Sequence, residues 1–173
     1  MRFVQPNTPE QQAVLHLQHG RHLLVRQRFA LSNHMRGVLS EYRIIMPQWV
    51  KVISRRLSEL LEETDSGLPM LARHLLAELN EEHDQLIDRS EHHEGQIKAW
   101  HVNSNVSLRL ACITGIGVLT ATAQSATVGE GQDFSNGRQL AAYPGLVPRQ
   151  ASSGGKARVL GISKRGDGTC VDC

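Results

Sequence analysis

Aliphatic residues recur every seven positions near the start of the chain, and this period constrains the fold more than any other feature. The row consists of Leu17, Leu24, Leu31, Val38 and Ile45. Met35 and Tyr42 lie four positions beyond two of its members. Such a period is typical of a long helix that packs against another helix in a coiled-coil-like seam. Thr8 is a good N-cap and Pro9 a good first helical residue, so we expect this helix to run from there to about Tyr42.

Two further helices are expected, the second from Pro47 to about Glu63 and the third over roughly 68–94, with a TDSG turn at 64–67 between them. One side of the third is leucine-rich, with Leu68, Leu71, Leu75, Leu79 and Leu86. Together the three helices predict an antiparallel helical arm over residues 7–100. Apolar residues make up 40% of the chain and aromatic residues only 4%, so the core must consist mainly of small and aliphatic side chains. We therefore expect a mainly α fold.

Charge is segregated along the chain although the net charge is only +2. Residues 1–56 hold nine Lys/Arg and two acidic residues. Residues 57–100 hold three Lys/Arg and eleven acidic residues, and residues 101–173 hold seven Lys/Arg and four acidic residues. A basic, acidic, basic order indicates that a polyanion contacts the two ends of the chain. The alternative is that both kinds of charge only keep long helices in solution.

The pattern changes after about residue 102, where short helices are expected at 108–113, 119–126 and 134–143, followed by irregular or short extended structure from Pro144. The sequence ITGIG at 113–117 joins the first two short helices, as in a helix-hairpin-helix. Gly115 and Gly117 would allow positive φ and bring backbone amides close to a phosphate, with Ile116 in the core. The alternative is a plain tight turn.

The segment SSGGK at 152–156 places two hydroxyls beside flexible backbone and a cation. A serine that attacks a phosphodiester needs room for close approach and cations that stabilise the transition state. Ser152 and Ser153 are the candidates, with Arg158, Lys164 and Arg165 nearby. A flexible polar linker is the alternative interpretation.

Other kinds of site have weak support. His16, His19 and His22 drift around a helix surface, and CVDC at 170–173 is a lone CxxC, so we expect no metal site in this chain. Cys112 lies in an apolar run and is expected in the core. No apolar run approaches the ~20 residues of a membrane span, so we expect a cytoplasmic protein without membrane contacts.

Four segments carry a resemblance to a known family: RFVQPNTPEQQAVLHL, RHLLVRQRFALSNHMRGVLSEYRI, ITGIGVLTATA and GRQLAAYPGLVPRQASSGGKARVLGISKRG. From about Arg2 to Asp167 the chain resembles the insertion sequence 110/1111 family of transposases. The resemblance implies an N-terminal RuvC-like domain in which four acidic residues bind divalent metal such as Mg²⁺. A coiled-coil arm and a transposase domain with a nucleophilic serine follow, and some members use a structured guide RNA.

The resemblance assigns roles to residues of this chain. It makes Ser153 the nucleophile, with Ser152 as the alternative. The expected nucleic-acid contacts are Arg138, Lys156, Arg158, Lys164 and Arg165. Thr114 and Pro144 depart from the family pattern, which usually has proline and leucine there.

The resemblance also divides the chain into four parts. Residues 1–6 are expected to be a remnant of the RuvC-like domain, 7–100 the arm, 101–167 a truncated transposase domain and 168–173 a tail outside the family pattern. We expect binding and transposition of DNA by strand cleavage and transfer in the parent family. Because the four acidic residues would lie upstream, this chain is expected to hold no cofactor and to be inactive alone. Self-association through the arm is also expected. The alternative is a nucleic-acid-binding or dimerising helical module without catalysis.

Overall fold

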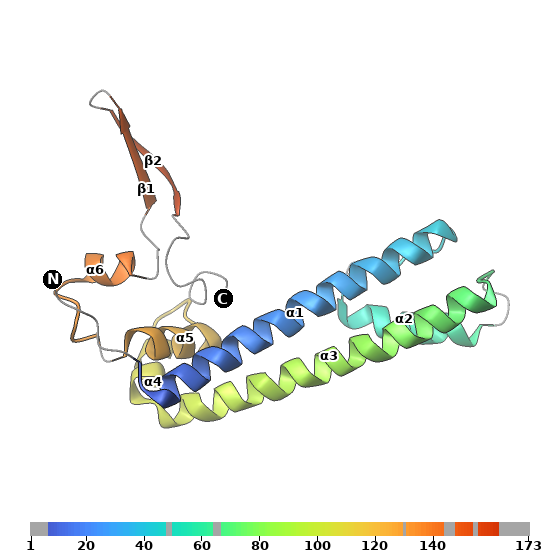
Figure 1. Cartoon of the computed structure of the whole chain (residues 1–173), viewed down its shortest axis with the longest axis horizontal. Coiled ribbons are helices and arrows are strands. Elements are labelled where there is room, and N and C mark those ends of the chain that lie inside the picture. Colours follow the sequence, from blue (N-terminus) through green and yellow to red (C-terminus); the bar gives the residue numbers. More distant parts are fainter. Residues whose placement is uncertain are drawn as a thin grey trace. The chain divides into compact units, whose positions relative to one another are not determined.

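The computed structural model describes residues 7–47, 50–63, 67–129, 131–143, 148–153 and 156–162. Its elements are α1 (Pro9–Glu41), α2 (Val50–Glu62), α3 (Met70–Asn103), α4 (Asn105–Ala111), α5 (Val118–Val128), α6 (Gly137–Ala142), β1 (Pro148–Ser153) and β2 (Lys156–Ile162) (Figure 1). The expected mainly α fold is confirmed. The chain divides into a helical unit, Gly20–His93, and a terminal unit made of Met1–His19 and Glu94–Cys173.

Helix α1 begins where the sequence predicts. The Gln11 backbone amide donates to Thr8 Oγ1 at 3.2 Å, and the Thr8 amide donates to Gln11 Oε1 at 2.8 Å. This reciprocal capping satisfies two amides that the first turn leaves without helical partners. Helix α2 begins at Val50 instead of Pro47, and α3 continues nine residues past the expected Glu94, to Asn103.

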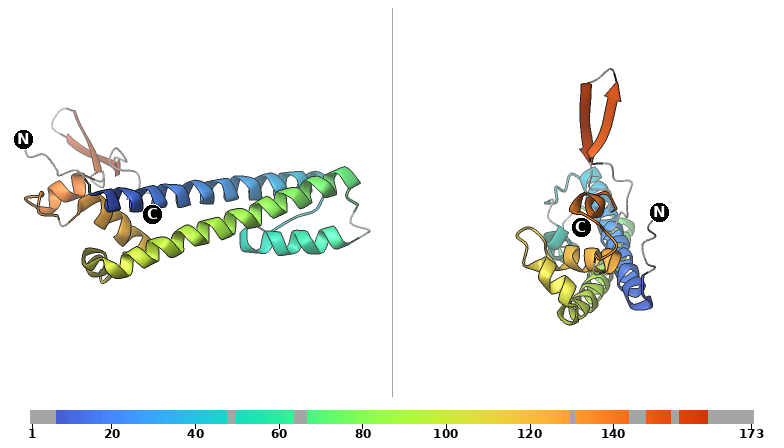
Figure 2. Two further views of the ribbon diagram at one scale, coloured as in Figure 1. Left: turned by 60° about the horizontal axis from the view of Figure 1, so that its bottom comes forward. Right: turned by 90° about the vertical axis from the view of Figure 1, so that its left-hand side faces the viewer.

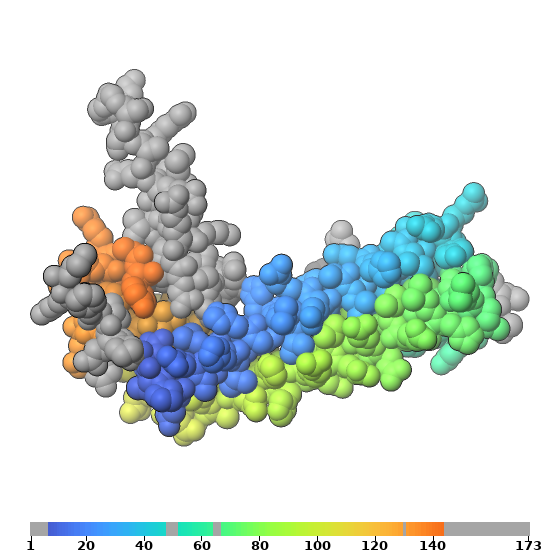
Figure 3. Space-filling view, viewed as in Figure 1, coloured from blue at the N-terminus to red at the C-terminus, as the bar shows by residue number. Residues whose placement is uncertain are grey.

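The helical unit packs three helices around one apolar core. In Figure 1 the α1 and α3 segments of this unit run antiparallel, and α2 lies alongside them. A second view also shows α2 beside α3 (Figure 2). The buried core residues are Met35, Leu39, Ile53, Leu57, Leu68 and Leu76. In the space-filling view, side chains of α1 and α3 close against one another in this unit (Figure 3). The Arg73 guanidinium donates to the Leu61 carbonyl oxygen at 2.8 Å, which satisfies a carbonyl group at the end of α2.

Part of the expected apolar packing is wrong. Leu71 is 84% exposed, Leu75 is 42% exposed and Ile45, beyond the end of α1, is 93% exposed. The buried line of α3 instead starts with Ala72 and Leu76. One position is a rotation of about 100° on a helix, so a line displaced by one residue faces a different direction. Leu24 and Met35 of the seven-residue pattern are buried, as expected.

The terminal unit is held together by small side chains and buried hydrogen bonds. The buried residues of α5 are Ala121, Thr122, Ala123, Ser125, Ala126 and Thr127. Gln18 of α1 is buried, and its Nε2 donates to Thr122 Oγ1 at 2.8 Å and to the Leu119 carbonyl oxygen at 3.2 Å. His101 Nδ1 lies 2.7 Å from Ser107 Oγ, which joins α3 to α4. Cys112 is exposed, contrary to the expectation that it is a core residue, because it follows α4 in the turn before α5.

Candidate nucleic-acid site

Cys112 and the ITGIG segment form a six-residue connection between α4 and α5, and these two helices pack on each other. Ser104 caps α4 by accepting a hydrogen bond from the Ser107 amide at 3.3 Å. Gly115 adopts φ 94°, a left-handed conformation that favours glycine. The Ile116 amide donates to the Ile113 carbonyl oxygen at 3.0 Å and closes the turn. A positive φ at one glycine therefore reverses the chain between the two helices.

Gly117 is the N-cap of α5, with extended φ −79° and ψ 170°, and no side chain accepts a hydrogen bond at this cap. Thr114, Gly115 and Gly117 are exposed. Amides in the first helical turn have no partners within the helix, and the helix dipole adds partial positive charge there. The start of α5 therefore has the local chemistry for an anion. The helix-hairpin-helix assignment itself stays a prediction.

Arg138 lies on α6 and is exposed. Asn136 caps this helix, because its Oδ1 accepts a hydrogen bond from the Gln139 amide at 2.9 Å. The rings of Phe134 and Tyr143, on either side of the helix, meet edge to face with centroids 5.4 Å apart. Arg138 is thus carried on a short helix that is fixed at both ends.

The SSGGK segment spans the end of β1 and the start of β2, which pair as an antiparallel hairpin. Ser153 pairs with Lys156, Ser152 with Ala157 and Ala151 with Arg158. Paired positions and alternate positions along a strand share a face of the sheet. The positions of Ser153, Lys156 and Arg158 therefore share one face of the hairpin, and the position of Ser152 lies on the other. Gly154 and Gly155, together with Lys164 and Arg165, lie outside the described residues.

Among the described residues, no three His, Cys, Asp or Glu side chains come together in a cluster that could hold a metal ion. Divalent-metal sites for phosphoryl transfer need carboxylates in fixed geometry. The residues described here do not fit such an ion. Within the same residues, no helix is long and apolar enough to cross a membrane.

The sequence pattern did not single out Arg109, which is exposed on α4. It precedes ITGIG by only a few residues, and its side chain makes no ion pair within the described part of the chain. An arginine one helical turn before a turn that contains two glycines is a usable sequence signal. The surrounding LRLACI run obscures this signal, because it is typical of a core helix.

Comparison with known proteins adds an independent observation. Residues 107–169 match the family model described as the transposase IS116/IS110/IS902 family. The chain is 39% identical over 167 residues to the transposase for insertion sequence element IS1328 of Yersinia enterocolitica, covering 96% of this chain and 49% of that protein. It is 41% identical over 169 residues to a probable family 20 transposase of Pseudomonas aeruginosa, covering 96% and 50%.

A third relative is the transposase for insertion sequence element IS1111A of Coxiella burnetii, 41% identical over 170 residues, with 96% of this chain and 46% of the relative covered. No solved structure matches the chain. The chain thus spans about half the length of the curated relatives it matches. The family model, which matches residues 107–169, and these alignments, which cover 96% of the chain, show similarity to one family, the IS116/IS110/IS902 transposases.

Proposed function

We propose that this chain acts in DNA transposition by strand cleavage and transfer, with Ser153 as the nucleophile. The observation that carries the proposal is 39–41% identity to transposases along 96% of the chain. The hairpin register supports the choice of serine, because the position of Ser153 shares a face with those of Lys156 and Arg158. Ser152, on the other face, is the weaker candidate.

In the proposed step the Ser153 hydroxyl loses its proton to a base and its oxygen bonds to the scissile phosphorus. The bond from phosphorus to the leaving sugar oxygen breaks, and that oxygen takes a proton. The strand is then joined to the protein as a serine phosphodiester, and a DNA hydroxyl reverses the attack to complete transfer. Cations near the phosphate stabilise the charge that builds up on its oxygens, a role suited to Lys156, Arg158, Lys164 and Arg165.

We infer that Gly115 and Gly117 hold the DNA backbone through main-chain amides, with Arg138 as a further phosphate contact. Such contacts fix position without reading sequence. Because they release counterions, affinity for DNA should fall steeply as salt rises.

A structured guide RNA and a second copy of the chain, bound through the helical unit, are further proposed partners.

We also infer that the chain alone does not turn over DNA. Metal-assisted cleavage needs clustered carboxylates, and the described residues do not bring such a set together. No step of the proposal is therefore routed through a metal ion held by the described residues. The chain would bind DNA and contribute its serine when another protein of the family supplies the rest of the site.

The test mixes this chain with wild-type IS1328 transposase, Mg²⁺ and a nicked, labelled duplex that traps covalent intermediates. Adducts of the two proteins separate on a denaturing gel, because the chain aligns with about half of the relative. We expect an adduct of this chain's size only in the mixture, lost in Ser153→Ala and retained in the neighbouring control Ser152→Ala.

Three outcomes would contradict the proposal. A chain-sized adduct that survives Ser153→Ala excludes this serine as the nucleophile. Failure of the wild-type chain to form an adduct, while IS1328 transposase forms its own, excludes a catalytic role for the chain. Strand transfer by the chain alone refutes the inferred need for a second protein.

A further inference from the structure

A pocket of about 560 Å³ opens beside α4 in the terminal unit. It is lined by Asn105, Val106, Arg109, Leu110, Ile113 and Gln132. Five of these belong to α4 and the turn that follows it, and Gln132 faces them from the loop after α5. The volume lies in the range of about 300–1,000 Å³ that small-molecule and cofactor sites occupy.

The lining combines three kinds of chemistry. Val106, Leu110 and Ile113 supply an apolar surface, and Ile113 is 53% exposed, so this surface is open to a ligand. Asn105 and Gln132 are amide side chains, which can both donate and accept hydrogen bonds.

Among the lining residues that the structure describes, Arg109 is the charged one. It lies four residues after Asn105, so these two residues share one face of α4, and Ile113 follows in the turn after the helix. Its guanidinium is exposed and forms no ion pair with the rest of the described chain. A planar cation in this setting can contact a phosphate or stack on a base.

We propose that the α4 pocket holds an unpaired nucleotide of single-stranded DNA. The base would lie against the apolar surface, the amides would bond its polar edge, and Arg109 would contact the adjoining phosphate. A base inside a duplex is stacked and cannot enter, whereas a displaced or cleaved strand offers such a nucleotide. The pocket adjoins the turn at 112–117, whose exposed glycines would bind the phosphate backbone of the same DNA strand through main-chain amides. The inference rests on the proposed function in DNA transposition.

The test is a fluorescence-anisotropy titration of the whole chain at several salt concentrations. The probes are a single DNA strand, the duplex of equal length, the RNA strand of the same sequence and an abasic DNA strand. The variants are Arg109→Gln and Ile113→Ser, both at exposed positions, with Arg26→Gln as the matched control. Arg26 is an exposed arginine on α1, in the helical unit, so this control removes the same charge outside the pocket.

We expect Arg109→Gln to weaken single-strand binding about tenfold, because the variant loses a charge-assisted hydrogen bond to the phosphate. The slope of log K against log salt should fall by about 0.7, the value for one phosphate of a single strand. Arg26→Gln should show neither change. Ile113→Ser should weaken binding of the normal strand and leave the abasic strand unaffected.

Equal losses for Arg109→Gln and Arg26→Gln, with wild-type binding intact, would overturn the pocket assignment while DNA binding stands. An Ile113→Ser effect that persists on the abasic strand would show that no base occupies the apolar surface. Arg109-dependent preference for the RNA strand would overturn the choice of DNA. If the wild-type chain binds none of the probes, both this inference and the DNA-binding part of the proposed function fail.

Discussion

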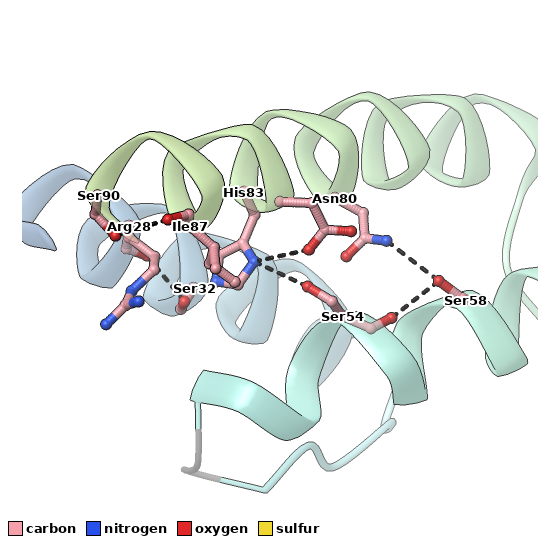
Figure 4. A network of polar contacts seen from close by, with 9 residues as sticks. Arg28, Ser32, Ser54, Ser58, Asn80, His83, Ile87 and Ser90 are labelled. Atoms are coloured by element: carbon pink, nitrogen blue, oxygen red, sulfur yellow. Dashed lines mark hydrogen bonds and ion pairs between the residues drawn. The ribbon is translucent and has the colours of Figure 1, made fainter. Parts of the chain in front are cut away.

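His83 lies in the interior of the helical unit, where a charge is costly. Its side chain is fully buried, and its Nδ1 is 2.8 Å from Ser54 Oγ of α2 (Figure 4). Within the described residues its Nε2 has no hydrogen-bond partner, and the same holds for Arg28 Nε and Asn80 Oδ1. Protonated imidazole donates from both nitrogens, so the charged form would leave one donor unsatisfied as well as burying a charge.

Burial lowers the pKa of His83 from its ordinary 6.5, and the positive charge of Arg28 lowers it further. Asp84, whose Oδ1 is 3.6 Å from Nδ1, acts in the opposite direction without cancelling the effect of burial. The unfolded chain thus binds this proton more readily than the folded one. The resulting stability is fully present above pH 6.5 and is lost as pH falls from there to the lowered folded-state pKa. Over this window a difference of one proton costs up to about 1.4 kcal/mol per pH unit.

We therefore predict that His83→Gln flattens the pH dependence of stability between about pH 7.5 and pH 5. The measurement is urea unfolding followed by circular dichroism, and stopping near pH 5 keeps most carboxylates ionised. The control is His74→Gln, an exposed position on the same helix, which should keep the wild-type slope. The reasoning is refuted if His83→Gln and wild type lose stability in parallel.

Two further predictions concern the terminal unit. Gln18→Leu removes both hydrogen bonds that Gln18 donates to α5 and places a branched side chain against Thr122. We expect the free energy of unfolding, measured with urea, to fall by about 1–3 kcal/mol, and to stay unchanged in the exposed control Gln12→Leu. Equal stability of Gln18→Leu and wild type would contradict this prediction. Gly115→Ala should cost about 1 kcal/mol of stability, because a φ of 94° suits glycine; no neighbouring atom would contact the added methyl group, so no steric clash adds to this cost. Gly117→Ser, at an extended N-cap, should be neutral or stabilising. Thermal melting of both variants checks this, and an unchanged Tm for Gly115→Ala would show that the turn can adopt another conformation.

The start of α1 follows from local sequence, but part of the buried face of α3 does not. Thr8 and Pro9 locate the start of α1 because capping depends on neighbours a few residues away. The buried face of α3 could not be found in the same way. Leu68 and Leu86 are buried as expected, but Asn80 and His83 are buried beside them while Leu71 and Leu75 are exposed. Hydropathy therefore indicates only part of the buried face. Polar residues in a core are identified only when their partners on other helices are known.

Some features of the candidate site also follow from local sequence, and others depend on tertiary packing. The glycines at 115 and 117 predict a turn, and the observed φ of 94° at Gly115 agrees with that local preference. The pairing of Ser153 with Lys156 depends on the register of a hairpin. The composition of SSGGK does not predict that register. The pocket beside α4 depends on Gln132, which approaches only after the chain has passed through α5. Contacts of this range are set by tertiary packing, not by local pattern.

The proposed contacts also differ in what they can recognise. Main-chain amides at the start of α5 and arginines on phosphates bind any DNA of suitable shape, because the phosphate backbone is the same in every sequence. A pocket that admits a base adds a requirement of another kind, since the nucleotide must first leave the duplex. With Arg109 beside the apolar residues of α4, this part of the chain would select a DNA state, unpaired over paired, where the glycine turn alone could not.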